Sequence, residues 1–140
     1  MIRKFEKKDL DEVMSLWLHV NIEAHSFIEE DYWKKNYEMV RKLIPNAEVF
    51  VAEENHQIHG FIGLIDDYIA GIFVKAEEQS KGIGSELLHT AMEVKNHLHL
   101  NVYRKNTGAV KFYQRCGFII VSQEIDKDTS EEEYSMEWHR

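Results

Sequence analysis

The stretch that decides the fold covers residues 72–88 and reads IFVKAEEQSKGIGSELL. It begins with an apolar run typical of a buried strand and ends with apolar residues at helical spacing, from Ile83 onward. The polar turn between them carries Gly82 and Gly84, which allow close approach to the backbone because glycine has no Cβ. The first N–H groups of a helix have no partner inside it, so this turn predicts a phosphate or pyrophosphate site, with Lys81 and Ser85 beside it.

Two other phosphate-binding loops do not fit this turn. A Walker loop requires Gly-Lys-Ser or Gly-Lys-Thr after its spacer, and the chain contains neither. The dinucleotide fingerprint requires a third small residue where Leu87 stands, and Leu87 belongs to the apolar stripe of the helix. A strand-to-helix turn that binds nothing is the plain structural alternative.

The rest of the chain alternates between helical and strand periodicity. The apolar spacing predicts helices at residues 9–20, 31–43, 83–96 and 108–116, the second of them stopped by Pro45. It predicts strands at 49–52, 58–65, 68–74, 98–103, 118–121 and 134–138, with the central strand at 68–74 and a hairpin tip at 131–133. With a strand at the N-terminus the order is βααβββαβαββ, which indicates a mixed α/β (α+β) domain around one sheet, covering residues 1–140.

Composition indicates one globular domain and excludes several classes of protein. The chain has 140 residues, of which 44% are hydrophobic and 30% charged, and its net charge is −8. An acidic protein is a poor partner for nucleic acid, and no apolar run is long enough for a membrane span. The N-terminus carries no signal-peptide pattern, and Cys116 is the only cysteine, so we expect a cytoplasmic protein. The sequence does not predict an oligomeric state.

The charge is unevenly distributed along the chain. Residues 94–123 contain no Asp or Glu and carry +5, which leaves −13 on the rest of the chain. A local positive field inside an acidic protein favours a specific anionic ligand over a polyanion. Solvated helix faces are the alternative explanation of the same pattern.

Two motifs together resemble the GNAT N-acetyltransferase family. The first is Gln79-x-x-Gly82-x-Gly84 after the central strand, which is similar to the family's acetyl-CoA pyrophosphate loop. The second runs from Asn106 through Phe112-Tyr113 to Gly117-Phe118 and is similar to the family's other hallmark. The predicted element order also follows the family over essentially the whole chain. The N-terminal part resembles a subgroup of small bacterial members, some of which acetylate protein lysines.

The resemblance implies a fold and a donor site. The fold has a central, mostly antiparallel sheet with a splayed parallel strand pair, here residues 68–74 and 98–103, and the pantetheine arm lies in the gap like an added strand. The residues implied to bind acetyl-CoA are Ile72, Phe73, Val74, Gln79, Ser80, Lys81, Gly82, Ile83, Gly84, Ser85 and Asn106. The basic side chains Arg104, Lys105 and Lys111 are placed where they would meet the nucleotide end, although simple helix exposure explains them equally well.

The implied chemistry is direct attack of an amine on a thioester. Tyr113 occupies the family's general-acid position, and a phenol of pKa near ~10 can protonate a departing thiolate of pKa near ~8.5. Packing beside Phe112 is the alternative role of Tyr113, and backbone N–H groups near Val74 would meet the developing oxyanion. A GNAT-fold module that binds acyl-CoA without catalysis is the alternative function.

The general base and the acceptor site are less defined. Some relatives carry a glutamate in the central strand, but residues 68–74 hold no carboxylate. The candidate bases are Asp67, His25, Asp66 and Glu29, and an amine that arrives neutral needs none of them. Phe27, Trp33, Tyr68 and Tyr32 are candidate walls of the acceptor pocket, each of which could equally be a core residue.

The substrate is expected to be an amine, either a small molecule or a protein lysine. The residues expected at an acidic acceptor mouth are Glu23, Glu29, Glu30, Asp31, Asp66 and Asp67, and solubility is the alternative explanation for them. The pairs His56/His59 and His97/His99 suggest zinc, but no third ligand with a fixed spacing accompanies them, so we expect no metal site.

Overall fold

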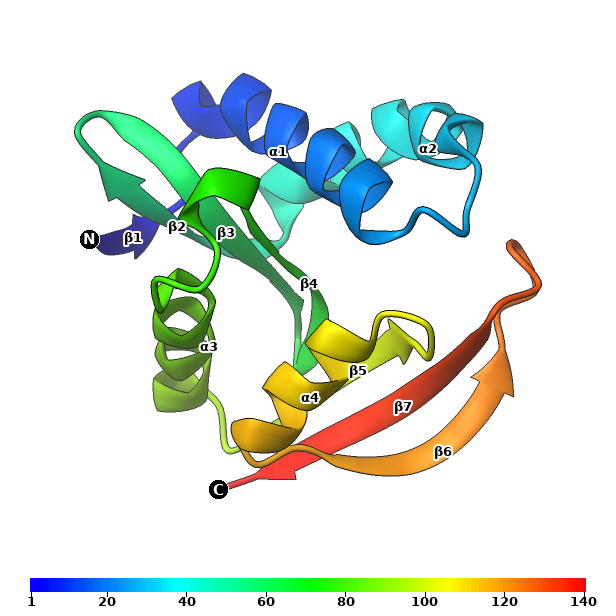
Figure 1. Ribbon diagram of the computed structural model, residues 1–140. Coiled ribbons are helices and arrows are strands. Elements are labelled where there is room, and N and C mark those ends of the chain that lie inside the picture. Colours follow the sequence, from blue (N-terminus) through cyan, green and yellow to red (C-terminus); the bar gives the residue numbers. More distant parts are fainter.

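The computed structural model describes all residues from Met1 to Arg140 and contains one sheet with helices on both faces (Figure 1). The strands are β1 (Ile2–Lys4), β2 (Glu48–Glu54), β3 (Gln57–Ile65), β4 (Tyr68–Val74), β5 (His97–Tyr103), β6 (Ile119–Ile125) and β7 (Glu132–His139). The helices are α1 (Leu10–Ala24), α2 (Glu30–Leu43), α3 (Ile83–Val94) and α4 (Thr107–Arg115), with short 3-10 turns η1 (Lys7–Asp9), η2 (Ile44–Asn46) and η3 (Ala76–Glu78).

The sheet has 7 strands in the order β1-β2-β3-β4-β5-β7-β6, and every neighbouring pair is antiparallel except β4 and β5. This confirms the predicted mixed α/β fold with its mostly antiparallel sheet and parallel pair. Strand β4 is central, as its continuous apolar run predicts. None of the helices is long and apolar enough to cross a membrane.

Two apolar cores lie on the two faces of the sheet. Helices α3 and α4 cover one face, where Leu87, Leu98 and Met136 are completely buried. Helices α1 and α2 cover the other face of the N-terminal half, where Val13, Val51 and their neighbours form the second core. Because successive side chains along a strand point to opposite faces of the sheet, a strand can contribute side chains to both cores.

The parallel strands β4 and β5 diverge after a short contact. They are paired only at Tyr68↔His99 and Ile69↔Leu100, while β4 stays with β3 up to Gly60↔Val74 and β5 stays with β7 up to Tyr103↔Glu133. The C-terminal ends of strands β4 and β5 are visibly apart (Figure 1). The backbone groups on the facing edges are therefore free to pair with an inserted ligand.

Several boundaries differ from the sequence predictions. Helix α1 continues to Ala24, beyond the predicted end at residue 20, because residues 21–24 have no helix-stopping signal and complete another turn. Strands β6 and β7 are longer than predicted, because their polar ends pair with each other at the surface. The hairpin tip lies at residues 126–131, so Glu132 and Glu133 are strand residues and the predicted tip at 131–133 is wrong.

Candidate functional site

The glycine turn between β4 and α3 exposes backbone N–H groups. Ser80 and Gly82 both have left-handed backbone angles (φ 68° and 89°), and Gly82 is the N-cap of α3. The N–H groups of Ile83, Gly84 and Ser85 have no backbone partner, because the intrahelical bonding begins with Glu86 N–H donating to the Gly82 carbonyl at 3.0 Å. These donors lie at the positive end of the helix dipole, where an anion is stabilised.

Gln79 fastens this turn to the end of the central strand. Its Nε2 donates to the carbonyl oxygen of Val74 over 3.0 Å. The first position of the glycine motif is thus a structural link between β4 and the turn, which holds the N–H groups of α3 beside the open edge of β4.

A groove of about 820 Å³ runs from this turn along β4 to α4. Its volume is in the range of small-molecule sites. The lining residues are Val20, Ala24, Ile72, Val74, Glu78, Gln79, Ser80, Gly82, Gly84, Ser85, His89, Asn106, Gly108, Ala109, Lys111, Phe112, Tyr113, Arg115 and Cys116. The structure thus brings together both sequence motifs, which are far apart in the chain, at one cavity.

Some residues predicted to bind the donor do not line the groove. The side chains of Ile72 and Val74 line it, whereas Phe73 points to the opposite face and stacks on Phe61 with ring centroids 4.8 Å apart. Ile83 packs against the core under α3, and Lys81 pairs with Glu78 over 3.3 Å. Phe73 and Ile83 can therefore contribute only backbone groups to this groove, which are the groups that the resemblance implies for them.

Tyr113 is a buried residue at the wall of the groove. Its side chain is 8% exposed and its ring contacts Phe112 and Phe118, with centroids 5.3 and 5.6 Å away. Burial raises the pKa of the Tyr113 phenol above its ordinary value, and the nearby Cys116 and Tyr68 raise it further. The phenol is therefore a proton donor throughout the neutral pH range.

Asn106 and His25 form a hydrogen-bonded pair at the edge of the groove. Asn106 Oδ1 accepts from the Ala109 N–H at 3.3 Å and caps α4, while its Nδ2 lies 3.3 Å from Nε2 of His25. His25 Nδ1 lies 3.1 Å from the Asn21 carbonyl oxygen, to which only a protonated Nδ1 can donate. The Nε2 lone pair of His25 therefore faces the Asn106 amide, and this contact occupies the atom that a general base would use.

The environment of His25 keeps its ring neutral. Burial lowers the pKa of His25, and the ring stacks on Trp33 at 5.2 Å and meets Phe27 and Tyr103 edge-on. His25, one of the four candidate bases, is placed beside the groove but does not line it, and its Nε2 already faces Asn106.

The predicted acceptor-pocket aromatics separate into two groups. Trp33 is 7% exposed and packs in the core between α1 and α2, so the prediction that it walls a pocket is wrong. Phe27 and Tyr68 are half-buried, Phe27 under the Lys105 ammonium and Tyr68 against His99. Both side chains retain an accessible surface, Phe27 against Tyr103 at the open end of β5 and Tyr68 at the end where β4 and β5 are paired.

The predicted carboxylate bases lie outside the groove. Asp66 and Asp67 are exposed in the turn before β4, where the Asp67 carboxylate faces His97 at 3.8 Å. Glu29 is exposed at the N-cap of α2. The acidic residues expected at one acceptor mouth are thus dispersed over separate turns, because the β3–β4 turn and the α2 start belong to different ends of the fold.

The basic residues also differ in their surroundings. Arg104 and Lys105 pair with Glu132 (2.6 Å) and Glu131 (3.1 Å) on the β6–β7 hairpin and do not line the groove. The prediction that they meet the nucleotide end is therefore wrong. Lys111 and Arg115 lie on successive turns of α4, line the groove and have no carboxylate partner.

Sequence reasoning missed an acidic patch, which we define as Asp126 and Glu133. Neither carboxylate takes part in an ion pair, and Asp126 Oδ2 accepts from the Tyr103 hydroxyl at 2.9 Å. Burial and the neighbouring acids raise the pKa of Glu133. Burial also raises the pKa of Tyr68, and the charges of Glu133 and Asp126 raise it further. Glu133 looked like part of a solvated hairpin tip, and only the strand register places it opposite Tyr103.

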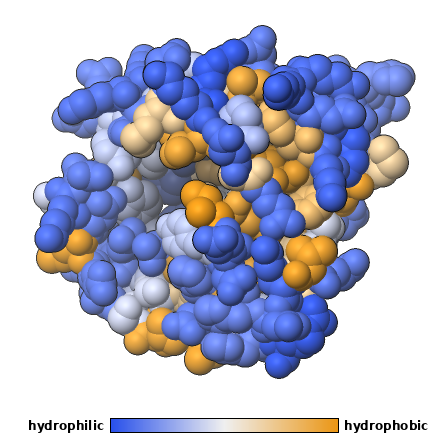
Figure 2. Space-filling model, turned by 180° about the vertical axis from the view of Figure 1, so that it is seen from behind, coloured by the Kyte–Doolittle hydropathy of each residue, from blue (hydrophilic) through white to orange (hydrophobic).

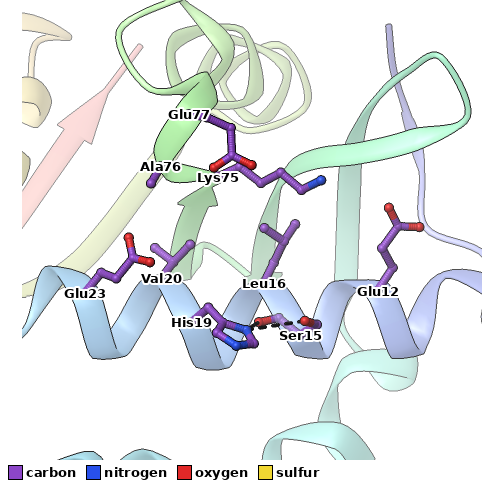
Figure 3. Close-up of a pocket in the computed structure, with 9 residues that line it drawn as sticks. All are labelled: Glu12, Ser15, Leu16, His19, Val20, Glu23, Lys75, Ala76 and Glu77. Carbon is purple, nitrogen blue, oxygen red and sulfur yellow. Dashed lines mark hydrogen bonds between the residues drawn. The ribbon is translucent and has the colours of Figure 1, made fainter.

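A smaller cavity of about 330 Å³ lies between α1 and the segment after β4 (Figure 3). Glu23 and Glu77 point into it from opposite sides, and Lys75 reaches across toward α1. Val20 lines both cavities, so the smaller one adjoins the large groove. Figure 2 shows the molecule from behind the view of Figure 1. The surface on this side has a hollow near its middle, with both hydrophilic and hydrophobic residues around it.

Comparisons of the sequence with a family model and with known proteins indicate the same family. Residues 45–120 match the model of the acetyltransferase (GNAT) domain. The chain is 33% identical to the peptidyl-lysine N-acetyltransferase YiaC of Escherichia coli, over 99% of this chain and 96% of that protein. It is 28% identical to the peptidyl-lysine N-acetyltransferase YjaB of the same organism, over 89% of this chain and 86% of that protein.

Solved structures share the fold. The apo form of Escherichia coli YjaB in solution superposes with a TM-score of 0.86 at 23% identity, covering 99% of this chain and 96% of that one. The PaiA N-acetyltransferase of Thermoplasma acidophilum, solved with coenzyme A, has a TM-score of 0.83 at 21% identity, covering 100% and 98%. These findings confirm the predicted family, its enzyme class and its acetyl donor: the chain belongs to the GNAT family of N-acetyltransferases.

Proposed function

We propose that this protein transfers the acetyl group of acetyl-CoA to the side-chain amine of lysines in other proteins. The observation that carries the proposal is the groove that joins the open N–H groups of α3, the free edge of β4 and the phenol of Tyr113. Residues 1–140 act as one catalytic domain in this proposal. We place the reaction in the cytoplasm, since the single cysteine, Cys116, is free and half-buried.

The groove fits the donor in shape and charge. The N–H groups of Gly84 and Ser85 suit a pyrophosphate, and Lys111 and Arg115 add unpaired positive charge on the same side. The unpaired edge of β4 beyond Ile69 suits the amide groups of a pantetheine arm, which would pair with it as a strand does. Asn106 Nδ2 has a second N–H beyond the one that faces His25, and this N–H is available to the arm.

Tyr113 is our candidate for the general acid. Bound acetyl-CoA supplies a thioester, whose sulfur must receive a proton when the amine displaces it. The Tyr113 hydroxyl holds such a proton, because burial keeps the phenol in its neutral form at physiological pH. Its buried ring also excludes water from this wall of the groove, which limits hydrolysis of the thioester.

Glu133 is our candidate for the group that takes the amine's proton. A lysine ammonium must lose a proton before it can attack, and a carboxylate whose pKa is raised is a stronger base than an ordinary one. Glu133 lies on β7 opposite Tyr103, at the open end of β5, and its charge adds to the effect of burial on the pKa of Tyr68.

A protein lysine is the favoured acceptor for two reasons. YiaC and YjaB, the relatives with 33% and 28% identity, are peptidyl-lysine N-acetyltransferases, and the similarity to YiaC covers nearly both chains. The unpaired acidic patch attracts a cationic amine, and basic residues next to the lysine would strengthen the attraction.

A panel of amines tests this function. The release of CoA thiol is followed with lysine peptides flanked by Lys/Arg, with lysine peptides flanked by Asp/Glu, and with small amines. We expect basic peptides to have the highest kcat/KM and to lose that advantage at high salt, where the Debye length falls below about 8 Å. Equal rates for all peptides at every salt concentration contradict selection by the acidic patch. Tight acetyl-CoA binding with no thiol release for any amine indicates a module that binds without catalysis.

A further inference from the structure

The pairing of β5 with β7 gathers imidazole and carboxylate groups at one end of the sheet. His97 lies opposite His139 in the register, and Glu137 shares the same face because it is two residues from His139. The alternate residues Leu98 and Met136 are completely buried beneath α3 and α4, so the histidines and Glu137 project from the other face. His97 and Glu137 are about one-third exposed and His139 is two-thirds exposed, which leaves the cluster accessible to ions.

The distances in this cluster match those between the ligands of a tetrahedral metal ion. His97 Nε2 and His139 Nε2 lie 3.3 and 3.2 Å from the same Oε1 atom of Glu137, and the three ligand atoms all lie within 4.8 Å of one another. Zinc binds nitrogen and oxygen at about 2.0–2.2 Å, so neighbouring ligands of a tetrahedral site are roughly 3.3–3.5 Å apart. Only the separation of the two imidazoles has to adjust.

We propose that His97, Glu137 and His139 form a binding site for a divalent transition-metal ion of the zinc class. Neutral imidazoles with one carboxylate suit such ions, and the carboxylate offsets part of the charge of the cation. The fourth position of the ion is open to solvent, since the cluster lies at the surface. The rings of His97 and His139 already stack at 4.4 Å, so little side-chain freedom is lost on binding.

Asp67 completes the arrangement from the turn before β4. Its Oδ2 lies 3.8 Å from Nδ1 of His97, the ring nitrogen that faces away from Glu137. This distance is too long for a direct hydrogen bond, but a negative charge beside Nδ1 favours the tautomer with its proton there, which leaves the Nε2 lone pair of His97 for the metal ion. Asp67, which the sequence suggested as a catalytic base, instead supports a metal ligand in this proposal.

The site is separate from the acetyl-transfer groove. None of His97, Glu137 and His139 lines the groove, and the chemistry of acetyl transfer needs no metal. A bound ion would join the start of β5 to the end of β7 at the end where β4 and β5 are still paired. We therefore expect metal binding to stabilise the fold without being required for activity.

Isothermal titration calorimetry with ZnCl₂ tests the site. We expect one Zn²⁺ per chain, and a loss of affinity of about 10–100-fold or more in His139→Ala and in Glu137→Gln. His56→Asn is the matched control, since His56 lies in the β2–β3 turn with a left-handed backbone that Asn tolerates, far from the cluster in sequence. Asp67→Asn should weaken binding less than loss of a ligand.

Folding of each variant is verified by its melting temperature without metal. Zn²⁺ should raise the melting temperature of the wild-type chain and of His56→Asn, and should leave that of His139→Ala unchanged. Absence of Zn²⁺ binding at micromolar concentration contradicts the site, and so does binding that His139→Ala and Glu137→Gln leave unaffected. Because these measurements use no acetyl donor or acceptor, their outcome is independent of the proposed acetylation.

Discussion

Asn106 and His25 are in direct contact: the Nδ2 amide of Asn106 lies 3.3 Å from Nε2 of His25 and can only donate to it. The contact joins the start of α4, which lines the donor groove, to the C-cap of α1, which leads to the loop between α1 and α2. It requires a neutral imidazole, because a protonated ring would place a second N–H against the amide.

The first prediction concerns the pH dependence that follows from this contact. Burial depresses the pKa of His25 below 6.5, so the unfolded chain binds the proton more tightly than the folded one. Stability therefore falls as the pH drops below 6.5 towards the lower pKa of the folded state, and is recovered above 6.5. His25→Gln, which keeps an acceptor but cannot titrate, should show a weaker dependence of melting temperature between about pH 7.5 and 5.5. An identical pH dependence in both proteins contradicts the neutral, buried assignment.

The second prediction concerns Gly84 in the donor site. A Cβ at this position would lie 3.6 Å from Phe112 and 3.8 Å from Val74, which is ordinary contact, so Gly84→Ala should fold like the wild type and serves as the control for folding. Gly84→Glu places a negative charge and bulk at the phosphate site and should abolish binding, measured by calorimetry or by the ligand-induced rise in melting temperature. Unchanged affinity in Gly84→Glu rules out the assignment of the pyrophosphate site.

The glycine turn and the order of elements were predictable from sequence, because both depend on local spacing. The close backbone approach at Gly82 and Gly84 and the apolar stripe of α3 follow directly from residues 72–88, whereas the left-handed angle of Gly82 is seen only in the structure. The pairing of Asn106 with His25 and of Glu137 with His97 was not predictable, since the two pairs join residues 81 and 40 positions apart. Helical periodicity places Trp33 on an apolar face but does not show what covers that face, and the structure buries it between α1 and α2.

The third prediction concerns Tyr113→Phe, which removes one hydroxyl and keeps the ring between Phe112 and Phe118. Without its proton donor the enzyme should lose about 10²-fold in kcat, with little change in the dissociation constant of acetyl-CoA. Tyr37→Phe, on α2 and against Trp17, is the matched control and should keep full activity. Wild-type turnover in Tyr113→Phe shows that the leaving sulfur obtains its proton elsewhere.

The fourth prediction compares the effects of substituting two neighbouring glutamates on β7. Glu133→Gln removes the carboxylate whose pKa is raised beside Tyr68, and should lower kcat/KM for a basic lysine peptide by about 10²-fold. Glu132→Gln makes the same change of charge one residue earlier, where the carboxylate pairs with Arg104 at the surface, and should have little effect. Equal effects of both substitutions contradict a specific role of Glu133 and indicate only a general loss of charge.

The most direct test of the central claim follows the acetyl group itself. The protein is incubated with acetyl-CoA labelled in the acetyl group and a lysine peptide flanked by basic residues, and the peptide is analysed by mass spectrometry while free CoA thiol is measured. The account predicts label on the lysine side-chain amine, in an amount equal to the thiol released, and about 10²-fold slower labelling with Tyr113→Phe. Acetyl-CoA binding without label on any lysine peptide would contradict it.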